Sequence, residues 1–344
     1  ARASWEGFRK HAPERRPFLL TRSGHAGVQR YAWAWTGDVE STWEGLRTTL
    51  RALLGLSLSG VYFVGSDIGG FSGNPSPELY LRWFQMAALT PFFRLHAARW
   101  TKRREPWRFG EEVLEGVRRA MALRESLLPY LYTLAHRASR EGKPLLRPLF
   151  LEGGPYTEEA FLLGEALLVA PVLEEGARAK EATRAAMGAQ AGARARAGPL
   201  PRAGGCPWGE DRALQGPTWA RLPAPLDRIP LLVRAGTVLP LLEEGGLALH
   251  LYPGAEGAEG RLYWDEGEGE GPYRLDRFRL LPAEGGFRLL WQGKGELPWP
   301  WARVRLRLFG KRLLRAHVEG EAHAAEEGGV LLPPFREALL EVEG

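Results

Sequence analysis

The segment from residue 16 to residue 71 constrains this chain most, because it alternates short apolar runs, polar loops and a helix. Residues 17–21 and 61–64 are apolar runs of strand length. Residues 43–56 have the apolar spacing of a helix that faces a core. The order strand, loop, helix, strand, loop is typical of a barrel of alternating strands and helices. In such a barrel, the loops at the carboxyl ends of the strands carry the chemistry.

Polar and aromatic side chains stand where those loops are expected. Arg22 follows the first apolar run, Asp38 follows the tryptophan-rich stretch that contains Trp35, and Asp67 follows the second run. Phe71 comes next, after two glycines. Two carboxylates, an arginine and aromatic rings at one edge of a sheet suggest a site for a sugar.

Five short motifs carry a closer resemblance. In chain order they are LLTRS, WTGDVESTW, GSDIGGFSGN, ELYLRWFQ and PFFRLH. In order and spacing they resemble the catalytic domain of family 31 of the glycoside hydrolases, the α-glucosidase and α-xylosidase family. The resemblance implies an α/β fold, the C-terminal half of a (β/α)8 barrel, followed by two all-β domains. It also implies retaining hydrolysis of an α-glucoside or oligosaccharide, with no cofactor and no metal.

The resemblance assigns the general acid/base to Asp38, because this aspartate matches the family's WTGD motif. Retaining hydrolysis needs a second carboxylate as nucleophile, about 5 to 5.5 Å away. A purely structural role for Asp38 is capping the helix that starts near Trp43, since aspartate is a favoured N-cap.

The same resemblance implies five substrate-binding residues. Arg22, Asp67 and His96 would bind sugar hydroxyls, and Trp35 and Phe71 would form apolar walls. Four of them have a structural alternative. Arg22 can form a salt bridge to a neighbouring strand's carboxylate, for example Asp67, which would then be its buried partner. Phe71 and His96 can belong to the core.

The family's nucleophile lies in a W-x-D-M-N-E-P run, and no such run occurs among these 344 residues. Residues 1–147 are therefore expected to be the C-terminal half of the catalytic barrel. The missing N-terminal half of the enzyme would be its partner. Half a barrel leaves strand edges unpaired, so we expect the chain alone to be poorly stable and inactive.

Helical spacing extends over residues 77–89 and 111–139, with Pro129 predicting a break in the second stretch. Short apolar runs follow, separated by Gly and Pro, which is a strand pattern. Residues 148–243 resemble the family's proximal β-sandwich and residues 244–344 its distal β-sandwich. The acidic turn at 263–271 contains the carboxylates of Asp265, Glu266 and Glu268, which suit a hard cation, but a solvated turn is the simpler interpretation.

Residues 182–208 do not fit this pattern. They contain no acidic residue and are rich in Ala, Gly, Arg and Pro. One interpretation is an irregular linker. The other is a compensated frameshift in a G+C-rich gene, which would weaken the proximal sandwich and leave Cys206 without a functional role.

Composition excludes several classes of function. The net charge is +5, but the arginines are scattered and no nucleic-acid recognition motif accompanies them. No apolar run reaches the length of a membrane span, and no signal pattern is visible. The single cysteine fits a reducing cytoplasm, and thirteen Trp with many Arg and Pro suit a thermophile.

Other activities remain open. They are an α-xylosidase, an α-galactosidase or a transglucosylase of the same family, and a non-catalytic carbohydrate-binding remnant. The oligomeric state is also left open.

Overall fold

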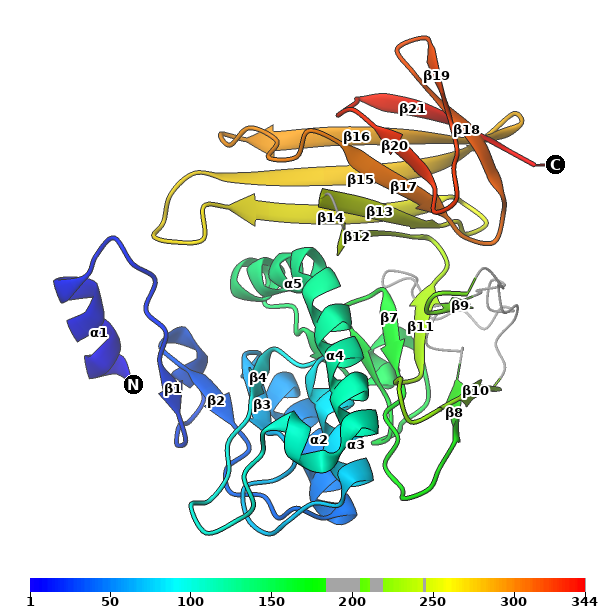
Figure 1. Ribbon diagram of the computed structural model, residues 1–344. Coiled ribbons are helices and arrows are strands. Elements are labelled where there is room, and N and C mark those ends of the chain that lie inside the picture. The colour runs from blue at the N-terminus through cyan, green and yellow to red at the C-terminus, as the bar shows by residue number, and fades with distance from the viewer. Residues whose placement is uncertain (184–204, 211–218, 244–245, 344) are drawn as a thin grey trace.

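The computed structural model describes residues 1–183, 205–210, 219–243 and 246–343. The first part of the chain combines strands and helices, and the last part consists of strands (Figure 1). The first sheet is parallel throughout, in the order β1-β2-β3-β4. Its strands are Leu20–Thr21, Trp33–Trp35, Val64–Asp67 and Phe92–Arg94. Parallel strands in chain order, separated by helices, confirm the barrel-type topology predicted from the sequence.

The helices follow the predicted apolar spacing closely. The α-helices are α1 Arg2–His11, α2 Trp43–Leu58, α3 Pro77–Ala87, α4 Glu111–Ser126 and α5 Leu128–Glu141. The 3₁₀ helices are η1 Val28–Arg30, η2 Pro106–Phe109 and η3 Leu149–Glu152. The predicted break is confirmed, since Pro129 lies in the first turn of α5, where its missing N–H costs no helical hydrogen bond.

Strand β3 begins at Val64, three residues later than the apolar run predicts. Asp67 therefore belongs to the strand rather than to the loop after it. Strand β4 approaches so closely that a Cβ at Gly65 would lie 2.0 Å from the carbonyl oxygen of Phe92. Gly65 has no side chain and therefore permits this close approach, so Gly65, Ser66 and Asp67 can pair with β4.

The proximal region forms an antiparallel sheet in the order β5-β6-β7-β11-β9, with a separate pair formed by β8 and β10. The strands are β5 Leu146–Arg147, β6 Phe161–Leu163, β7 Leu167–Val169, β8 Ala179–Thr183, β9 Gly205–Pro207, β10 Trp219–Pro223 and β11 Leu231–Arg234. Most of the irregular stretch 182–208 lies outside the described residues. Its described ends are residues 182–183, which belong to strand β8, and residues 205–208, which include strand β9. In β9, Cys206 is buried and pairs in register with Val233.

The distal region is a ten-stranded sheet in the order β19-β18-β21-β16-β15-β14-β12-β13-β17-β20. Its strands are β12 Thr237–Glu243, β13 Gly246–Tyr252, β14 Ala258–Asp265, β15 Tyr273–Ala283, β16 Gly286–Gly295, β17 Val304–Leu308, β18 Leu313–Val318, β19 Glu321–Ala324, β20 Val330–Leu332 and β21 Glu337–Val342. The sheet curls until β18 and β19 touch β20 (Figure 1). The predicted domain boundary at 243/244 falls inside the β12–β13 pair, so the sheet itself begins at Thr237.

Buried Arg82 on α3 joins the barrel region to the proximal region. Its guanidinium donates to the backbone carbonyls of four residues, Ala177, Ala224, Pro225 and Arg228. Desolvation lowers the pKa of Arg82 to about 10, so the side chain is still charged at neutral pH. Charge-assisted hydrogen bonds to several carbonyls compensate for burying that charge.

A second junction connects the barrel region with the distal region. Asp265, at the end of β14, is buried and accepts hydrogen bonds from Arg16, Tyr132 and Tyr263, each at 2.6 Å. These four residues are called the Asp265 clamp below. The expectation of a solvated acidic turn is therefore wrong for Asp265, because partners from two distant segments enclose it. Glu266 and Glu268 in the same turn are exposed.

Candidate active site

The carboxyl ends of the four parallel strands bring the predicted site residues to one edge of the sheet. Arg22 follows β1, Asp38 follows β2, Asp67 ends β3 and His96 follows β4. Parallel pairing of neighbouring strands fixes this arrangement, since all four strands end on the same side. The structure thus places the residues that the sequence predicts in one neighbourhood.

Asp38 lies at the surface of this edge and has one charged partner. Arg22 Nη1 donates to Asp38 Oδ1 at 3.1 Å, and the two side chains are 58% and 38% exposed. Helix α2 is capped by Thr42, whose hydroxyl accepts from the N–H of Gly45 at 2.9 Å. The capping alternative for Asp38 is therefore wrong. Its carboxyl remains accessible for chemistry.

Asp67 is held in a different way, because its side chain is fully buried. Two nitrogens of Arg94 donate to Asp67 Oδ1, Nε at 3.2 Å and Nη2 at 2.5 Å. Burial raises the pKa of Asp67, and Arg94 opposes that rise. The predicted alternative of a salt bridge from Arg22 to a neighbouring strand's carboxylate is confirmed, but the partner is Asp38. Asp67, the carboxylate suggested for that pair, binds Arg94 instead.

One aromatic pair and one cation–ring contact shape the edge between these carboxylates. The rings of Phe71 and His96 lie 5.5 Å apart, tilted by 31°. The guanidinium carbon of Arg94 lies 5.0 Å from the centre of the Trp35 ring, which favours a cation–π contact. Phe71 is fixed through its backbone, with its N–H donating to Val39 and its carbonyl accepting from Ala98.

Three buried polar atoms in this neighbourhood have no hydrogen-bond partner. They are Asp67 Oδ2, Trp35 Nε1 and Thr36 Oγ1. Unsatisfied buried polar atoms are rare in folded proteins, and they often mark a place where water or a ligand completes the network. Asp67 Oδ2 is an acceptor and Trp35 Nε1 is a donor, and both residues contact Arg94. Such unpaired groups fit a site for a polyhydroxylated ligand.

Arg94 is the residue that the sequence interpretation missed. It stands in the motif PFFRLH, two positions before His96. In an extended chain, residues two positions apart point to the same side. The spacing of Arg94 and His96 was therefore the one sequence signal that could have placed Arg94 in the site. Its role as the buried partner of Asp67 depends on the β3–β4 register, which pairs the two residues.

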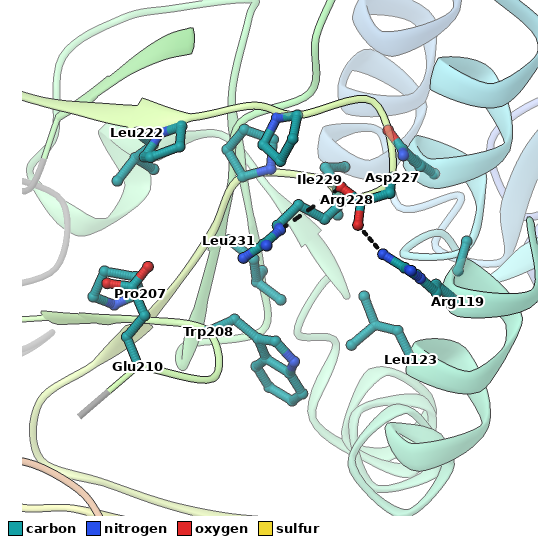
Figure 2. Close-up of a pocket in the computed structure, with 15 residues that line it drawn as sticks. Arg119, Leu123, Pro207, Trp208, Glu210, Leu222, Asp227, Arg228, Ile229 and Leu231 are labelled. Atoms are coloured by element: carbon teal, nitrogen blue, oxygen red, sulfur yellow. Dashed lines mark hydrogen bonds and ion pairs between the residues drawn. The ribbon is translucent and has the colours of Figure 1, made fainter. Parts of the chain in front are cut away.

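A cavity of about 540 Å³ lies elsewhere, between α4 and the proximal sheet (Figure 2). Trp208 forms one wall, and Arg119 makes an ion pair with Asp227 on another. None of the predicted site residues lines it. Glu210, which does, is followed directly by residues 211–218, which lie outside the described part of the chain.

Metal binding has no support in the described part of the chain. Within it, no group of three or more His, Cys, Asp or Glu side chains is placed to hold a metal ion. None of the described helices is long and apolar enough to cross a membrane.

Comparison with known proteins identifies two adjoining family matches. Residues 1–134 match the glycosyl hydrolases family 31 TIM-barrel domain, and residues 142–239 match the glycosyl hydrolase family 31 C-terminal domain. Human neutral alpha-glucosidase C is 37% identical over 282 residues, covering 77% of this chain and 29% of that protein. Alpha-glucosidase 2 of Bacillus thermoamyloliquefaciens is 45% identical over 177 residues, covering 50% of this chain and 22% of that protein.

Solved structures share the fold over the whole chain. The glucosidase II alpha subunit bound to a ligand named alpha3-Glc2 is 28% identical with a TM-score of 0.78, covering 100% of this chain and 40% of that one. A dextranase of Flavobacterium johnsoniae complexed with glucose reaches a TM-score of 0.86 at 24% identity, covering 100% of this chain and 48% of that one. The chain thus spans less than half the length of these proteins.

Proposed function

The chain belongs to glycosyl hydrolase family 31, and we propose on this premise that it supplies the acid/base half of an α-glucosidase active site. Asp38 is the general acid/base. The observation that supports it best is the geometry of Asp38: an accessible carboxylate at the carboxyl ends of the strands, held by Arg22 and not used as a helix cap.

The reaction proceeds in two steps of retaining hydrolysis. An aspartate of the upstream half of the enzyme forms a bond to the anomeric carbon while the bond to the leaving oxygen breaks. Asp38 gives its proton to that oxygen. Asp38 then takes a proton from water, whose oxygen attacks the anomeric carbon and releases the first carboxylate.

The other residues bind the sugar. Arg22 and His96 donate to hydroxyls, and Phe71 and Trp35 form the apolar walls. Asp67 is not the nucleophile in this proposal. Its side chain is fully buried, and Arg94 occupies Oδ1. Its part is to accept from a hydroxyl through Oδ2, which has no hydrogen-bond partner.

The substrate class in this proposal is an α-glucoside, which the names of the similar α-glucosidases support. An α-xylosidase or transglucosylase remains the alternative within the family, and a non-catalytic sugar-binding protein remains the alternative outside it. We also propose that the chain works in the cytoplasm, since its single cysteine needs no oxidising compartment.

The test is complementation. We expect the chain alone to leave 4-nitrophenyl α-glucoside intact. Fused behind the upstream part of the Bacillus α-glucosidase, it should release nitrophenol. Asp38→Asn in the fusion should abolish turnover, and Asp38→Ala should recover part of it when azide replaces water as the attacking group.

The matched control in the fusion is Glu40→Gln, because Glu40 is an exposed carboxylate two residues away. Full activity of the Asp38→Asn fusion would refute the acid/base assignment. Equal loss in Glu40→Gln would show that charge in this loop, and not Asp38 itself, is what matters.

A further inference from the structure

Arg104 is a buried cation that the proposed mechanism does not use. It lies between β4 and η2, and 5% of its surface is exposed. Burial lowers the pKa of Arg104, because water no longer solvates the charged guanidinium. A buried charge is tolerated where fixed polar groups replace the lost water. The groups that solvate Arg104 therefore show which segments it holds together.

Those groups belong to two loops of the candidate active site. Arg104 Nη2 donates to Ser41 Oγ at 3.2 Å, in the loop between β2 and α2 that carries Asp38. The same nitrogen donates to the carbonyls of Gly70 and Gly73, at 3.2 Å and 2.9 Å, in the loop after β3. One guanidinium therefore joins the loop of the proposed acid/base to the loop after β3.

The two loops also bind each other directly. The N–H of Phe71 donates to the carbonyl of Val39 at 2.7 Å, and the N–H of Ser41 donates to the loop after β3 at 2.8 Å. Val39 follows Asp38 in the chain, so these bonds fix the backbone from which the carboxyl extends. The ion pair of the Asp38 side chain is exposed, and exposed pairs hold a side chain weakly. The position of Asp38 therefore depends on its backbone.

Arg104 is itself fixed from the opposite side. Tyr80 is fully buried on α3, and its hydroxyl donates to the carbonyl of Arg104 at 2.6 Å. The ring of Tyr80 stacks on that of Phe109 in η2, with the ring centres 4.0 Å apart. Arg104 Nη1 also donates to the carbonyl of Lys102 at 2.5 Å. The guanidinium thus extends from a rigid base toward the two loops, as the support of a catalytic group requires.

We propose that Arg104 is a positioning residue for general acid/base catalysis by Asp38. The inference rests on the proposed function and adds to it a residue that acts through Ser41 and the loop after β3, without touching the substrate. Proton transfer needs the carboxyl of Asp38 within hydrogen-bond reach of the leaving oxygen. A displacement of about 1 Å can cost about 100-fold in rate.

Two substrates with different leaving groups separate positioning from a general loss of structure. Phenyl α-glucoside releases a basic phenolate, which needs the proton of Asp38. The phenolate released from 2,4-dinitrophenyl α-glucoside is a weak base and needs none. Because kcat/KM reports the barrier from free enzyme and substrate, a misplaced Asp38 lowers it for the phenyl substrate alone. The enzyme is the fusion with the upstream part of the Bacillus α-glucosidase.

In Arg104→Met we expect kcat/KM to fall about 100-fold for the phenyl substrate and less than about twofold for the dinitrophenyl substrate. Arg104→Lys keeps a cationic donor and should recover part of the loss. Asp38→Asn is the reference and should show the same selectivity at larger size. Arg82→Met is the matched control, because Arg82 is a buried arginine bound to carbonyls of the proximal region. It should affect both substrates equally.

Equal losses for the two substrates in Arg104→Met, or the same selectivity in Arg82→Met, would overturn the inference and leave the proposed function standing. If Arg104→Met does not fold, Arg104→Lys and Ser41→Ala decide, and the absence of a selective loss in both overturns the inference. Full activity of Asp38→Asn, or a fusion inactive on both substrates, would overturn the proposed function and the inference with it.

Hydrogen exchange by NMR on the chain alone gives a second readout. Arg104→Met should speed the exchange of the Ser41 and Phe71 N–H groups about tenfold. The N–H of Thr36, which donates to Gly65 at the β2–β3 pair, should exchange at the parent rate. Unchanged exchange at Ser41 and Phe71 would mean that the loops hold each other without Arg104, which would overturn the inference.

Discussion

The barrel region and the distal region are both built around sheets, but they differ in how those sheets end. Among the described strands, β1 pairs only with β2 and β4 only with β3, and Phe18 beside β1 is 58% exposed. The strands of the distal sheet reach 11 residues, and its two ends touch. The proposed chemistry therefore lies on the more open sheet, while the closed sheet contains none of the predicted site residues. Open edges leave backbone groups unpaired, so the two regions should differ in local stability.

The largest expected effect comes from the core of the distal region. Phe278 is fully buried, and its ring lies 5.6 Å from that of Trp291. We expect Phe278→Ala to lower the free energy of unfolding of this region by about 3–5 kcal/mol, because a cavity replaces the ring. Hydrogen exchange followed by mass spectrometry should show faster exchange in β14, β15 and β16.

The comparison predicts that β1–β4 exchange at the parent rate in this variant. Faster exchange in both regions would mean that they unfold as one unit. The contrast between an open and a closed sheet would then have no consequence for stability.

The next effect contrasts the two ion pairs of the candidate site. Arg94→Leu leaves the buried Asp67 without its charged partner, which we expect to cost about 3 kcal/mol. Arg22→Leu removes an exposed pair with Asp38 and should cost less than about 1 kcal/mol. Chemical denaturation of both variants measures the difference. Equal losses would contradict the role of Arg94 as the charged partner that stabilises buried Asp67.

The third prediction concerns the Asp265 clamp between the two regions. Burial would raise the pKa of Asp265, but hydrogen bonds from Arg16, Tyr132 and Tyr263 hold it at about 2. The folded pKa lies below the ordinary value of 3.8, so the stabilisation is complete above about pH 4 and is lost as pH falls through 2. A shift of this size corresponds to roughly 2 kcal/mol.

Asp265→Asn tests the clamp directly. We expect the parent to lose stability between pH 4 and pH 2 more steeply than the variant, as measured by thermal unfolding at each pH. Glu266→Gln, at the exposed neighbouring position, is the control and should follow the parent. Identical pH profiles for parent and Asp265→Asn would rule out the clamp as a source of stability.

The smallest effect is local to the loop that presents Asp38. Thr42 caps helix α2, so Thr42→Ala should cost about 1 kcal/mol, and Thr42→Ser should restore most of it. Denaturation midpoints measure both. A loss in Thr42→Ala that Ser does not restore would point to the methyl group of Thr42 rather than to its hydroxyl.

Much of the barrel region could be predicted because local signals and tertiary packing agree there. The helices from Trp43 and from Pro77 begin where their Thr42 and Ser76 caps stand, and Pro129 breaks the last helical stretch as predicted. The strand ends likewise brought Arg22, Asp38 and His96 to one edge, as the motifs predicted. Their roles in binding and catalysis stay predictions.

What could not be predicted depends on contacts between distant segments. Asp67 pairs with Arg94 rather than Arg22 because the β3–β4 register sets its neighbour, and a motif does not encode that register. The sequence predicts Asp265 as a solvated turn residue, yet Arg16, almost 250 positions earlier, donates a hydrogen bond to its buried carboxylate. Both errors have the same physical origin, since a carboxylate takes whichever cation the fold brings to it.

The four backbone carbonyls that accept hydrogen bonds from Arg82 also affect how the sequence can change during evolution. A backbone carbonyl accepts a hydrogen bond in the same way whichever side chain its residue carries. Positions 177, 224, 225 and 228 can therefore exchange their side chains over time while the junction with α3 persists. This contact therefore constrains the side chain at position 82 and none of the four accepting positions. A homologue without Arg82 should have a different backbone conformation in the segments that contain these four carbonyls.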